Sequence, residues 1–169
     1  MDETTLSLEP PLRACWVKIH TQKRVPMPLR GEKQTCHIFG GYNWRKDTIT
    51  WTTAQNKNSA TFIQFLEELF LKQYPTACIL LVMDNAGYHK SAAATAALSL
   101  FEQRVIPVFL PPYCSNLNPI ERFWRFLKEQ THANRLEDSI DALREQAIRV
   151  LSRQNDLCSD HRFSVSKYL

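Results

Sequence analysis

Hydrophobic residues in the first half of the chain follow the spacing of strands and then that of a helix. The segments Thr35 to Tyr42 and Thr48 to Thr52 are rich in β-branched and aromatic residues, which predicts an antiparallel hairpin. Apolar residues then recur at helical spacing after Asn58, a helix-capping residue, and this pattern ends before Pro75. The continuous apolar run from Cys78 to Met83 predicts a strand that is buried on both faces.

The second half of the chain predicts helices around one further strand. The alanine-rich segment Ser91 to Phe101 is typical of a helix, and Arg104 to Leu110 is typical of a strand in which Pro107 indicates a sheet edge or a bulge. Asn118-Pro119 supplies a cap and a first-turn proline for a helix that runs toward Thr131, and Leu136 to Arg153 predicts an amphipathic helix. This order of elements supports a mixed α/β fold.

Proline and polar residues dominate the chain before the hairpin. Residues 4–14 contain Pro10-Pro11 and indicate a loop. Cys15 to Ile19 predicts a short extended piece. Residues 21–33 are polar and basic and indicate an exposed connection.

The composition limits the class of protein. A chain of 169 residues with 44% hydrophobic residues has the length and apolar content of one globular domain. Its formal charge of +4 is compatible with binding a polyanion but does not identify a nucleic-acid binder. Five scattered cysteines without a Cys-x-x-Cys pair argue against zinc and disulfides, and no stretch predicts a signal peptide or a membrane span. We expect a cytoplasmic protein with reduced, mostly buried thiols.

Two carboxylates follow predicted elements at positions that suit chemistry. Asp84 comes directly after the apolar strand, at the end where open α/β sheets place ligands, and Glu121 lies in the first turn of the helix that Pro119 opens. Such a pair could share hard divalent ions, which prefer oxygen ligands. Two ordinary roles remain open: Glu121 could complete a capping box with Asn118, and Asp84 could cap the loop that follows it.

Two multi-residue phrases in this region carry a family resemblance. They are Asp84-Asn85-Ala86 with His89-Lys90-Ser91, and Leu110-Pro111-Pro112-Tyr113 with Leu117-Asn118-Pro119-Ile120-Glu121 and Trp124. In order and separation they resemble the second and third acidic motifs of the mariner-like DDE transposases, and most closely the bacterial insertion-sequence branch. The resemblance spans nearly the whole chain and implies an α/β, RNase H-like fold with a mixed sheet and flanking helices.

The same resemblance implies a catalytic metal site. It makes Asp84 and Glu121 ligands of two Mg²⁺ or Mn²⁺ ions and asks for a third acid in an upstream Asp-Glu pair, which Asp2-Glu3 fits, with Trp16 and Gly31 following. The family places an apolar strand before this first acid, whereas only Met1 precedes Asp2 here. We therefore expect an RNase H-like sheet that lacks most of its first strand.

Other residues near the motifs are assigned supporting roles. Asn85, His89 and Asn118 are expected near the catalytic carboxylates, although all three residue types are also common in turns, caps and cores. Tyr113 could stack on a base or pack beneath its loop. Candidate contacts to DNA phosphates are Lys90, Arg122, Arg125 and Lys128, with Arg45 and Lys46, and a solvated surface would explain these residues equally well.

The expected function is that of a transposase catalytic domain over residues 1–169, without the N-terminal helix-turn-helix domain that recognises element ends in the family. It would cleave and transfer DNA strands in the bacterial cytoplasm, with the nucleoid as its location when bound to DNA. A homodimer and an upstream reading-frame product that carries the DNA-binding domain are the expected protein partners. The alternatives are an inactive transposase remnant that at most binds DNA or a partner, and a nuclease that does not join strands.

Overall fold

The structure is a computed structural model that describes residues 1–27, 34–112, 114, 117–156 and 163–164. Within these residues, five strands form two sheets. The first sheet is antiparallel, in the order β1 (Asp2–Ser7), β2 (Thr35–Asn43) and β3 (Thr48–Ala54). The second is a parallel pair, β4 (Ile79–Met83) and β5 (Val105–Phe109). The hairpin and both later strands are therefore where the sequence predicts them.

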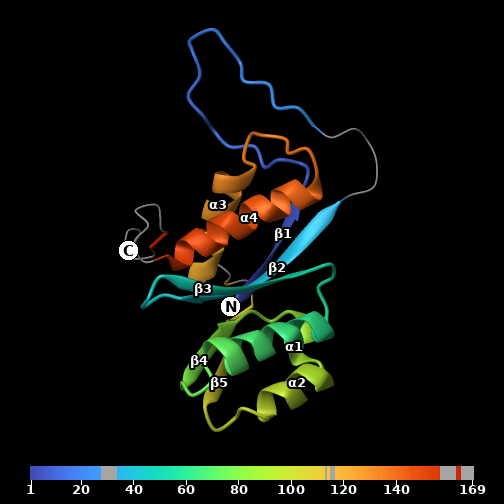
Figure 1. The fold of residues 1–169 in the computed structure, drawn as a ribbon, viewed down its shortest axis with the longest axis vertical. Coiled ribbons are helices and arrows are strands. Elements are labelled where there is room, and N and C mark those ends of the chain that lie inside the picture. The colour runs from blue at the N-terminus through green and yellow to red at the C-terminus, as the bar shows by residue number, and fades with distance from the viewer. Residues whose placement is uncertain (28–33, 113, 115–116, 157–162, 165–169) are drawn as a thin grey trace.

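Helices cover the three-stranded sheet on both faces. They are α1 (Ser59–Glu67), which continues as the π-helical segment η1 (Glu68–Gln73), the 3₁₀ turn η2 (Gly87–Lys90), α2 (Ala92–Ser99), α3 (Pro119–Thr131) and α4 (Ile140–Asn155). Figure 1 shows α3 and α4 against the sheet on one side, while α1, α2, β4 and β5 lie together beyond its other side. Among the described residues, no helix combines the length and the apolar composition that crossing a bilayer requires.

The pleat of β2 divides the hydrophobic core into two clusters. Ile38 packs with Leu6 of β1 and with Phe123 of α3, whereas its neighbour Phe39 packs with Phe62 of α1 and with residues of α2 and β4. Because successive side chains of a strand point to opposite faces, one strand supplies both cores. Residues on β1 must divide in the same way.

The strand β1 differs from the sequence prediction. Residues 4–14 were expected to be a loop, but Asp2–Ser7 pairs antiparallel with β2 in the register Asp2 with Gly40. Asp2, Thr4 and Leu6 form its buried face, so two of the three buried positions are polar and the apolar alternation that identifies a half-buried strand is hidden. The acid pair lies at the beginning of this strand rather than at its end.

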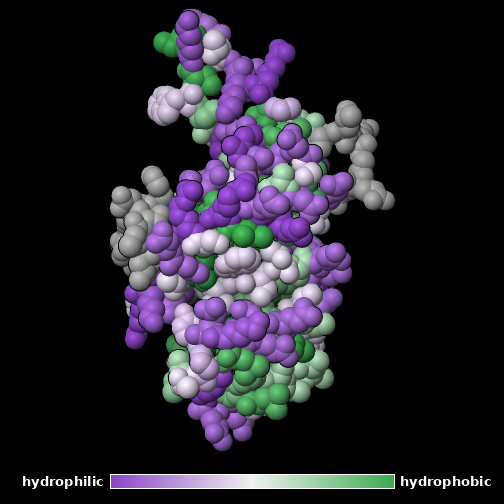
Figure 2. Space-filling view, in the orientation of Figure 1, coloured by the Kyte–Doolittle hydropathy of each residue, from purple (hydrophilic) through white to green (hydrophobic). Residues whose placement is uncertain are grey.

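The segment after β1 leaves the body of the molecule. Residues 8–27 form an irregular loop that is first hydrogen-bonded to Asn134 through Pro11 and Arg13 and then projects beyond α3 and α4 (Figure 1). Cys15 to Ile19 form no strand, contrary to the prediction. Trp16 is fully exposed. Figure 2 shows hydrophilic and hydrophobic side chains mixed on this loop, and further hydrophobic side chains at the surface over α2.

The strand β4 is less buried than its apolar run predicts. Leu81 and Met83 lie in the core that α1 and α2 cover, but Leu80 is 64% exposed, and Ile106 beside it on β5 is 62% exposed. The expectation of burial on both faces is therefore wrong for this strand. Pro107 lies in β5, which among the described strands pairs only with β4, so the predicted edge position is confirmed.

The beginning of β1 joins the two sheets and α3. The amino group of Met1 donates to the carbonyl of Val82 on β4, and the buried amide of Asn118 donates from Nδ2 to the carbonyl of Met1 over 3.0 Å. Since Asp84 follows β4 and Glu121 follows Asn118, these two contacts bring the three acids into one region.

Gly40 of β2 leaves room for the indole ring of Trp124. A Cβ added at Gly40 would lie 2.5 Å from Cη2 of Trp124, a distance that requires the ring to shift. We expect Gly40→Ala to lower the free energy of unfolding by about 1–3 kcal/mol, the usual cost of overpacking. Chemical denaturation measures this change. The matched control is Gly87→Ala, because a Cβ there meets no atom within 4 Å; equal effects at the two positions would contradict the steric explanation.

Candidate active site

Asp84 is presented by the end of β4 and is held by the turn that follows. Its Oδ1 accepts a hydrogen bond from the backbone N–H of Ala86 over 3.0 Å and lies 3.0 Å from Nδ1 of His89. The side chain is 42% exposed. One oxygen is therefore fixed by the protein, and the carboxylate still reaches solvent. The loop-capping role that sequence reasoning left open is present, and it does not occupy the second oxygen.

Asp2 approaches from β1 and is almost fully buried. Its Oδ2 accepts a hydrogen bond from the indole Nε1 of Trp124 over 3.1 Å, and the residue is 8% exposed. Burial, followed by the negative charge of Glu121, raises the pKa of Asp2 to about 7, and Glu3 and Asp84 add to the shift. The charges of Glu121, Glu3 and Asp84 all act on Asp2, so these acids lie near one another in the fold.

Glu121 lies in the first turn of α3 and is exposed. The side chain of Asn118, the N-cap residue, accepts no hydrogen bond from this turn and instead contacts Met1, so the capping box that sequence reasoning allowed is absent. Glu121, Trp124 and Lys128 follow one another at helical spacing, which places them along one side of α3. That side meets Asp2.

The three acids form one electrostatic cluster without forming a ready-made ion cage. Within the described part of the chain, no three His, Cys, Asp or Glu side chains are arranged to hold one ion. Their chemistry nevertheless fits a hard divalent cation, because carboxylate oxygens are the ligands such ions prefer and the protein fixes the carboxylates of Asp2 and Asp84 by hydrogen bonds. A cation would also relieve the repulsion that raises the pKa of Asp2.

Glu3 and His89 form a second, buried part of the site. The sequence analysis expected His89 near the catalytic carboxylates, as the structure has it, but gave Glu3 no role of its own. Nε2 of His89 lies 2.8 Å from Oε1 of Glu3, and the His89 side chain has no exposed surface. Burial alone would lower the pKa of His89, but the hydrogen bond and charge of Glu3, together with Asp84, raise it overall. Burial and Glu3 also raise the pKa of Tyr88. The missed signal was the pairing of Glu3 with Asp2 at adjacent positions of one strand.

The two supporting asparagines contact the backbone. Nδ2 of Asn85 donates to the carbonyl of Leu110 at the end of β5, while its Oδ1 accepts from Nζ of Lys90. Asn118 donates to Met1. Both amides thus hold the strands and the helix together around the acids, which is the structural use that their residue types allow.

Lys128 is the basic residue most closely associated with the acids. Burial lowers its pKa, and the nearby charges include Glu121 and Asp2, which raise it, and Arg13 and Lys57, which lower it. Arg122 and Arg125 are exposed on α3. Lys90 is exposed and its Nζ lies 4.9 Å from the ring centroid of Phe109. Of these cations, Lys128 interacts with the charges of Glu121 and Asp2, whereas Arg45 and Lys46 lie in the hairpin turn.

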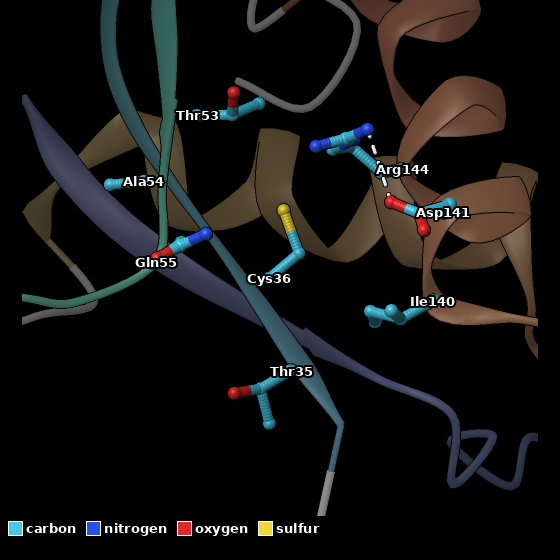
Figure 3. A pocket seen from close by; sticks show the side chains of 8 residues that line it. All are labelled: Thr35, Cys36, Thr53, Ala54, Gln55, Ile140, Asp141 and Arg144. Carbon is cyan, nitrogen blue, oxygen red and sulfur yellow. Dashed lines mark ion pairs between the residues drawn. The ribbon is translucent and has the colours of Figure 1, made fainter.

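A pocket lies at the opposite end of β1 from Asp2. Figure 3 shows Cys36 pointing into it, with the ion pair of Arg144 and Asp141 from α4 on the facing wall. Cys36 pairs with Leu6, whereas Asp2 pairs with Gly40, so the strand register separates this pocket from the acids. It takes no part in the candidate site.

The cysteines are less buried than expected. Cys36 is buried, but Cys15 and Cys78 are exposed, and no disulfide forms among the cysteines that the structure describes. Three residues singled out from the sequence, Gly31, Tyr113 and Cys158, lie outside the described residues.

Comparison with known proteins identifies the family. The family model of the DDE superfamily endonucleases matches residues 1–144. The chain belongs to this family. It is 28% identical over 133 residues to the insertion element IS630 uncharacterized 39 kDa protein of Shigella sonnei, covering 79% of this chain and 38% of that protein. It is 32% identical over 105 residues to uncharacterized protein y4pE/y4sA of Sinorhizobium fredii, covering 62% of this chain and 74% of that protein. The DDE superfamily membership that its motifs predicted is therefore confirmed.

Solved structures support the same fold. A Mos1 transposase paired-end complex with the left transposon end has a TM-score of 0.65 at 13% identity and covers 89% of this chain. The Mos1 strand transfer complex has a TM-score of 0.62 at 15% identity, again over 89% of this chain. The RNase H-like fold class predicted from the sequence is therefore confirmed. The DDE family chain spans 46% and 45% of these two Mos1 chains.

The raised pKa of Asp2 predicts a pH dependence of stability. Because its pKa is about 7 in the fold against an ordinary 3.8, the unfolded chain releases this proton first, and the Asp2 contribution to stability falls as pH rises from about 4 to about 7. We expect Asp2→Asn to be more stable than wild type above pH 7, by no more than about 4 kcal/mol, with no difference below pH 4. Denaturation curves across this pH range measure the difference, and a gap that does not change with pH would contradict it.

Proposed function

We propose that this chain is the catalytic domain of an insertion-sequence transposase, which cleaves DNA strands with divalent metal ions and transfers the resulting ends. The observation that carries the proposal is the convergence of Asp2 from β1, Asp84 from the end of β4 and Glu121 from the first turn of α3. These residues come from three separate elements, and the acidic motifs of the family include two of them. Carboxylates that serve only to stabilise a fold are not expected to lie close together, because their charges repel.

The site residues would divide the work as follows. Asp2, Asp84 and Glu121 would hold two Mg²⁺ or Mn²⁺ ions, with Asp2 and Asp84 each fixed by a hydrogen bond from the protein. Such ions would supply an activated water or DNA 3′-hydroxyl and stabilisation of the departing 3′ oxygen in an in-line displacement at phosphorus. The role of the protein is to fix the ligands beside an exposed face that DNA can approach.

Lys128 and the arginines of α3 would contact the DNA backbone. Lys128 lies on the same side of α3 as Glu121, so its ammonium is placed to contact a phosphate that reaches the acids. Arg122 and Arg125 extend this basic side of the helix at its exposed surface. Phosphate contacts of this kind position DNA without reading its sequence.

The proposed partners are transposon ends, target DNA and further protein. The related Mos1 structures are complexes with a transposon end and a strand transfer complex. The chain spans 38% of the IS630 protein, so recognition of element ends would come from a separate region or from an upstream reading-frame product. A homodimer and a bacterial cytoplasmic location, on the nucleoid when bound to DNA, complete the proposal.

One observation favours the alternative of a protein that binds DNA without cleaving it. No three metal-binding side chains are arranged around one ion within the described residues.

Thermal melting with and without Mg²⁺ separates the two functions. A catalytic domain should gain stability from Mg²⁺ and lose this gain in Asp84→Asn, because a ligand that binds only the folded state raises its melting temperature. A remnant should show the same melting curve with or without the ion.

Cleavage tests the acids directly. We expect Asp84→Asn and Glu121→Gln each to reduce Mg²⁺-dependent DNA cleavage by about a thousandfold or more, because several kcal/mol of transition-state stabilisation are lost. Both replacements keep the shape of the side chain, so cooperative melting should remain. Glu102→Gln, at an exposed turn after α2, is the control and should cleave as wild type does. Cleavage by either active-site variant at the wild-type rate would refute the assignment.

The salt dependence of DNA binding tests Lys128. We expect Lys128→Gln to weaken binding of a short duplex and to reduce the slope of log K against log salt by about 1, the value for one lost phosphate contact. Fluorescence anisotropy at several salt concentrations gives this slope. The control is Lys72→Gln, because Lys72 pairs with Glu68 over 2.7 Å on η1, away from α3. If Lys128→Gln and wild type gave equal slopes, Lys128 would not contact a DNA phosphate.

A further inference from the structure

Glu3 lies on the opposite side of β1 from Asp2 and faces the turn that follows β4. The pleat of the strand requires this division, since adjacent residues point to opposite faces. Asp2 contacts Trp124 of α3, whereas Oε1 of Glu3 lies 2.8 Å from Nε2 of His89 in η2. The Glu3 side chain is only 4% exposed. A buried carboxylate is costly unless it is paired, so this contact fixes both partners.

His89 connects Glu3 to Asp84 through its two ring nitrogens. Nε2 contacts Oε1 of Glu3. Nδ1 is hydrogen-bonded to the backbone carbonyl of Asp84 over 3.4 Å and lies at ion-pair distance, 3.0 Å, from Oδ1 of the same residue. The ring is held between Phe62, with centroids 4.5 Å apart, and Tyr88, with centroids 4.6 Å apart. The backbone N–H of His89 donates to the carbonyl of Ala86 over 3.0 Å. The imidazole therefore cannot turn away without breaking contacts on every side.

The contacts of His89 with Glu3 and Asp84, which we call the bridge, determine which oxygen of the Asp84 carboxylate is available to a ligand. Oδ1 accepts the N–H of Ala86 and lies at ion-pair distance from Nδ1 of His89, so two groups of the segment after β4 contact it. Within the described part of the chain, no hydrogen bond or ion pair is made to Oδ2, which is therefore the oxygen that remains for a ligand. A carboxylate that is anchored in this way presents one oxygen in a defined direction instead of rotating between several orientations.

We propose that Glu3 and His89 are positioning residues that orient the Asp84 carboxylate for binding a divalent cation through Oδ2. This inference rests on the proposed function, and it assigns a separate role to Glu3, the second residue of the Asp2-Glu3 pair. The strand β1 then serves the site twice, supplying a ligand on one face and the support for another ligand on the opposite face.

Direct measurement of Mn²⁺ affinity tests the bridge independently of cleavage. The variants are Glu3→Gln, which removes the charge that faces His89, and His89→Gln, whose single amide nitrogen cannot contact both carboxylates. We expect each to bind Mn²⁺ about 10- to 100-fold more weakly than wild type, as is usual when a support of a metal ligand is lost. Isothermal titration calorimetry gives the affinity, and cooperative melting without metal shows that each variant folds.

A control separates positioning from the loss of one negative charge. Glu67→Gln removes the same charge as Glu3→Gln from an exposed position on α1. It should bind Mn²⁺ as wild type does. In addition, saturating Mn²⁺ should restore the cleavage rate of Glu3→Gln, which a general loss of structure would not allow.

The outcomes distinguish this inference from the proposed function. If wild type binds Mn²⁺ and Asp84→Asn abolishes binding, the metal site exists. Wild-type affinity in folded Glu3→Gln and His89→Gln would then overturn the bridge alone. Loss of cooperative melting in both variants would also overturn it, because the pair would then be part of the core. Binding by wild type that Asp84→Asn does not change would instead refute the proposed metal site itself.

Discussion

The pairing of β1 with β2 is the constraint on which the site depends. The register places Asp2 opposite Gly40, and only a glycine leaves space there for the indole of Trp124, whose Nε1 then donates to Asp2. A shift of one residue would exchange the faces of β1 and send Asp2 toward α1 instead of α3. The arrangement of acids is therefore a consequence of strand register before it is a matter of side-chain chemistry.

The contacts at the beginning of β1 also explain why the acidic site lowers the stability of the fold. Contacts of Met1 with Val82 and Asn118 draw β4 and α3 together, and the acids that follow these elements, Asp84 and Glu121, repel the charge of Asp2. Burial of Asp2 increases that repulsion because little water screens it. Stability given up at such a position is a common property of sites that are organised for a ligand rather than for the fold.

The sequence was most informative where chemistry and local structure coincide. An apolar run that ends in Asp84 and a helix that begins at Pro119 could be located from pattern alone, and the structure has both. It was least informative for β1, because Asp2 and Thr4 occupy buried positions that apolar residues usually fill. Glu3 was missed for the same reason: its role depends on a strand pleat that the pattern did not reveal. The exposure of Leu80 depends on which elements cover β4, and this is a property of the tertiary arrangement that a local window does not contain.

The three acids are restrained to different degrees, and this difference follows from the elements that carry them. Asp2 is held by an indole in the core, and Asp84 by a buried imidazole and a backbone amide, so each presents one oxygen from a fixed frame. Glu121 is exposed in the first turn of a helix and retains its side-chain freedom. A site built for phosphoryl transfer benefits from both properties, because fixed ligands lower the cost of ordering the metal ions while a mobile one can adjust as DNA enters. The division between a rigid pair on the sheet and an adaptable acid on α3 thus comes from the same geometry that joins β1, β4 and α3.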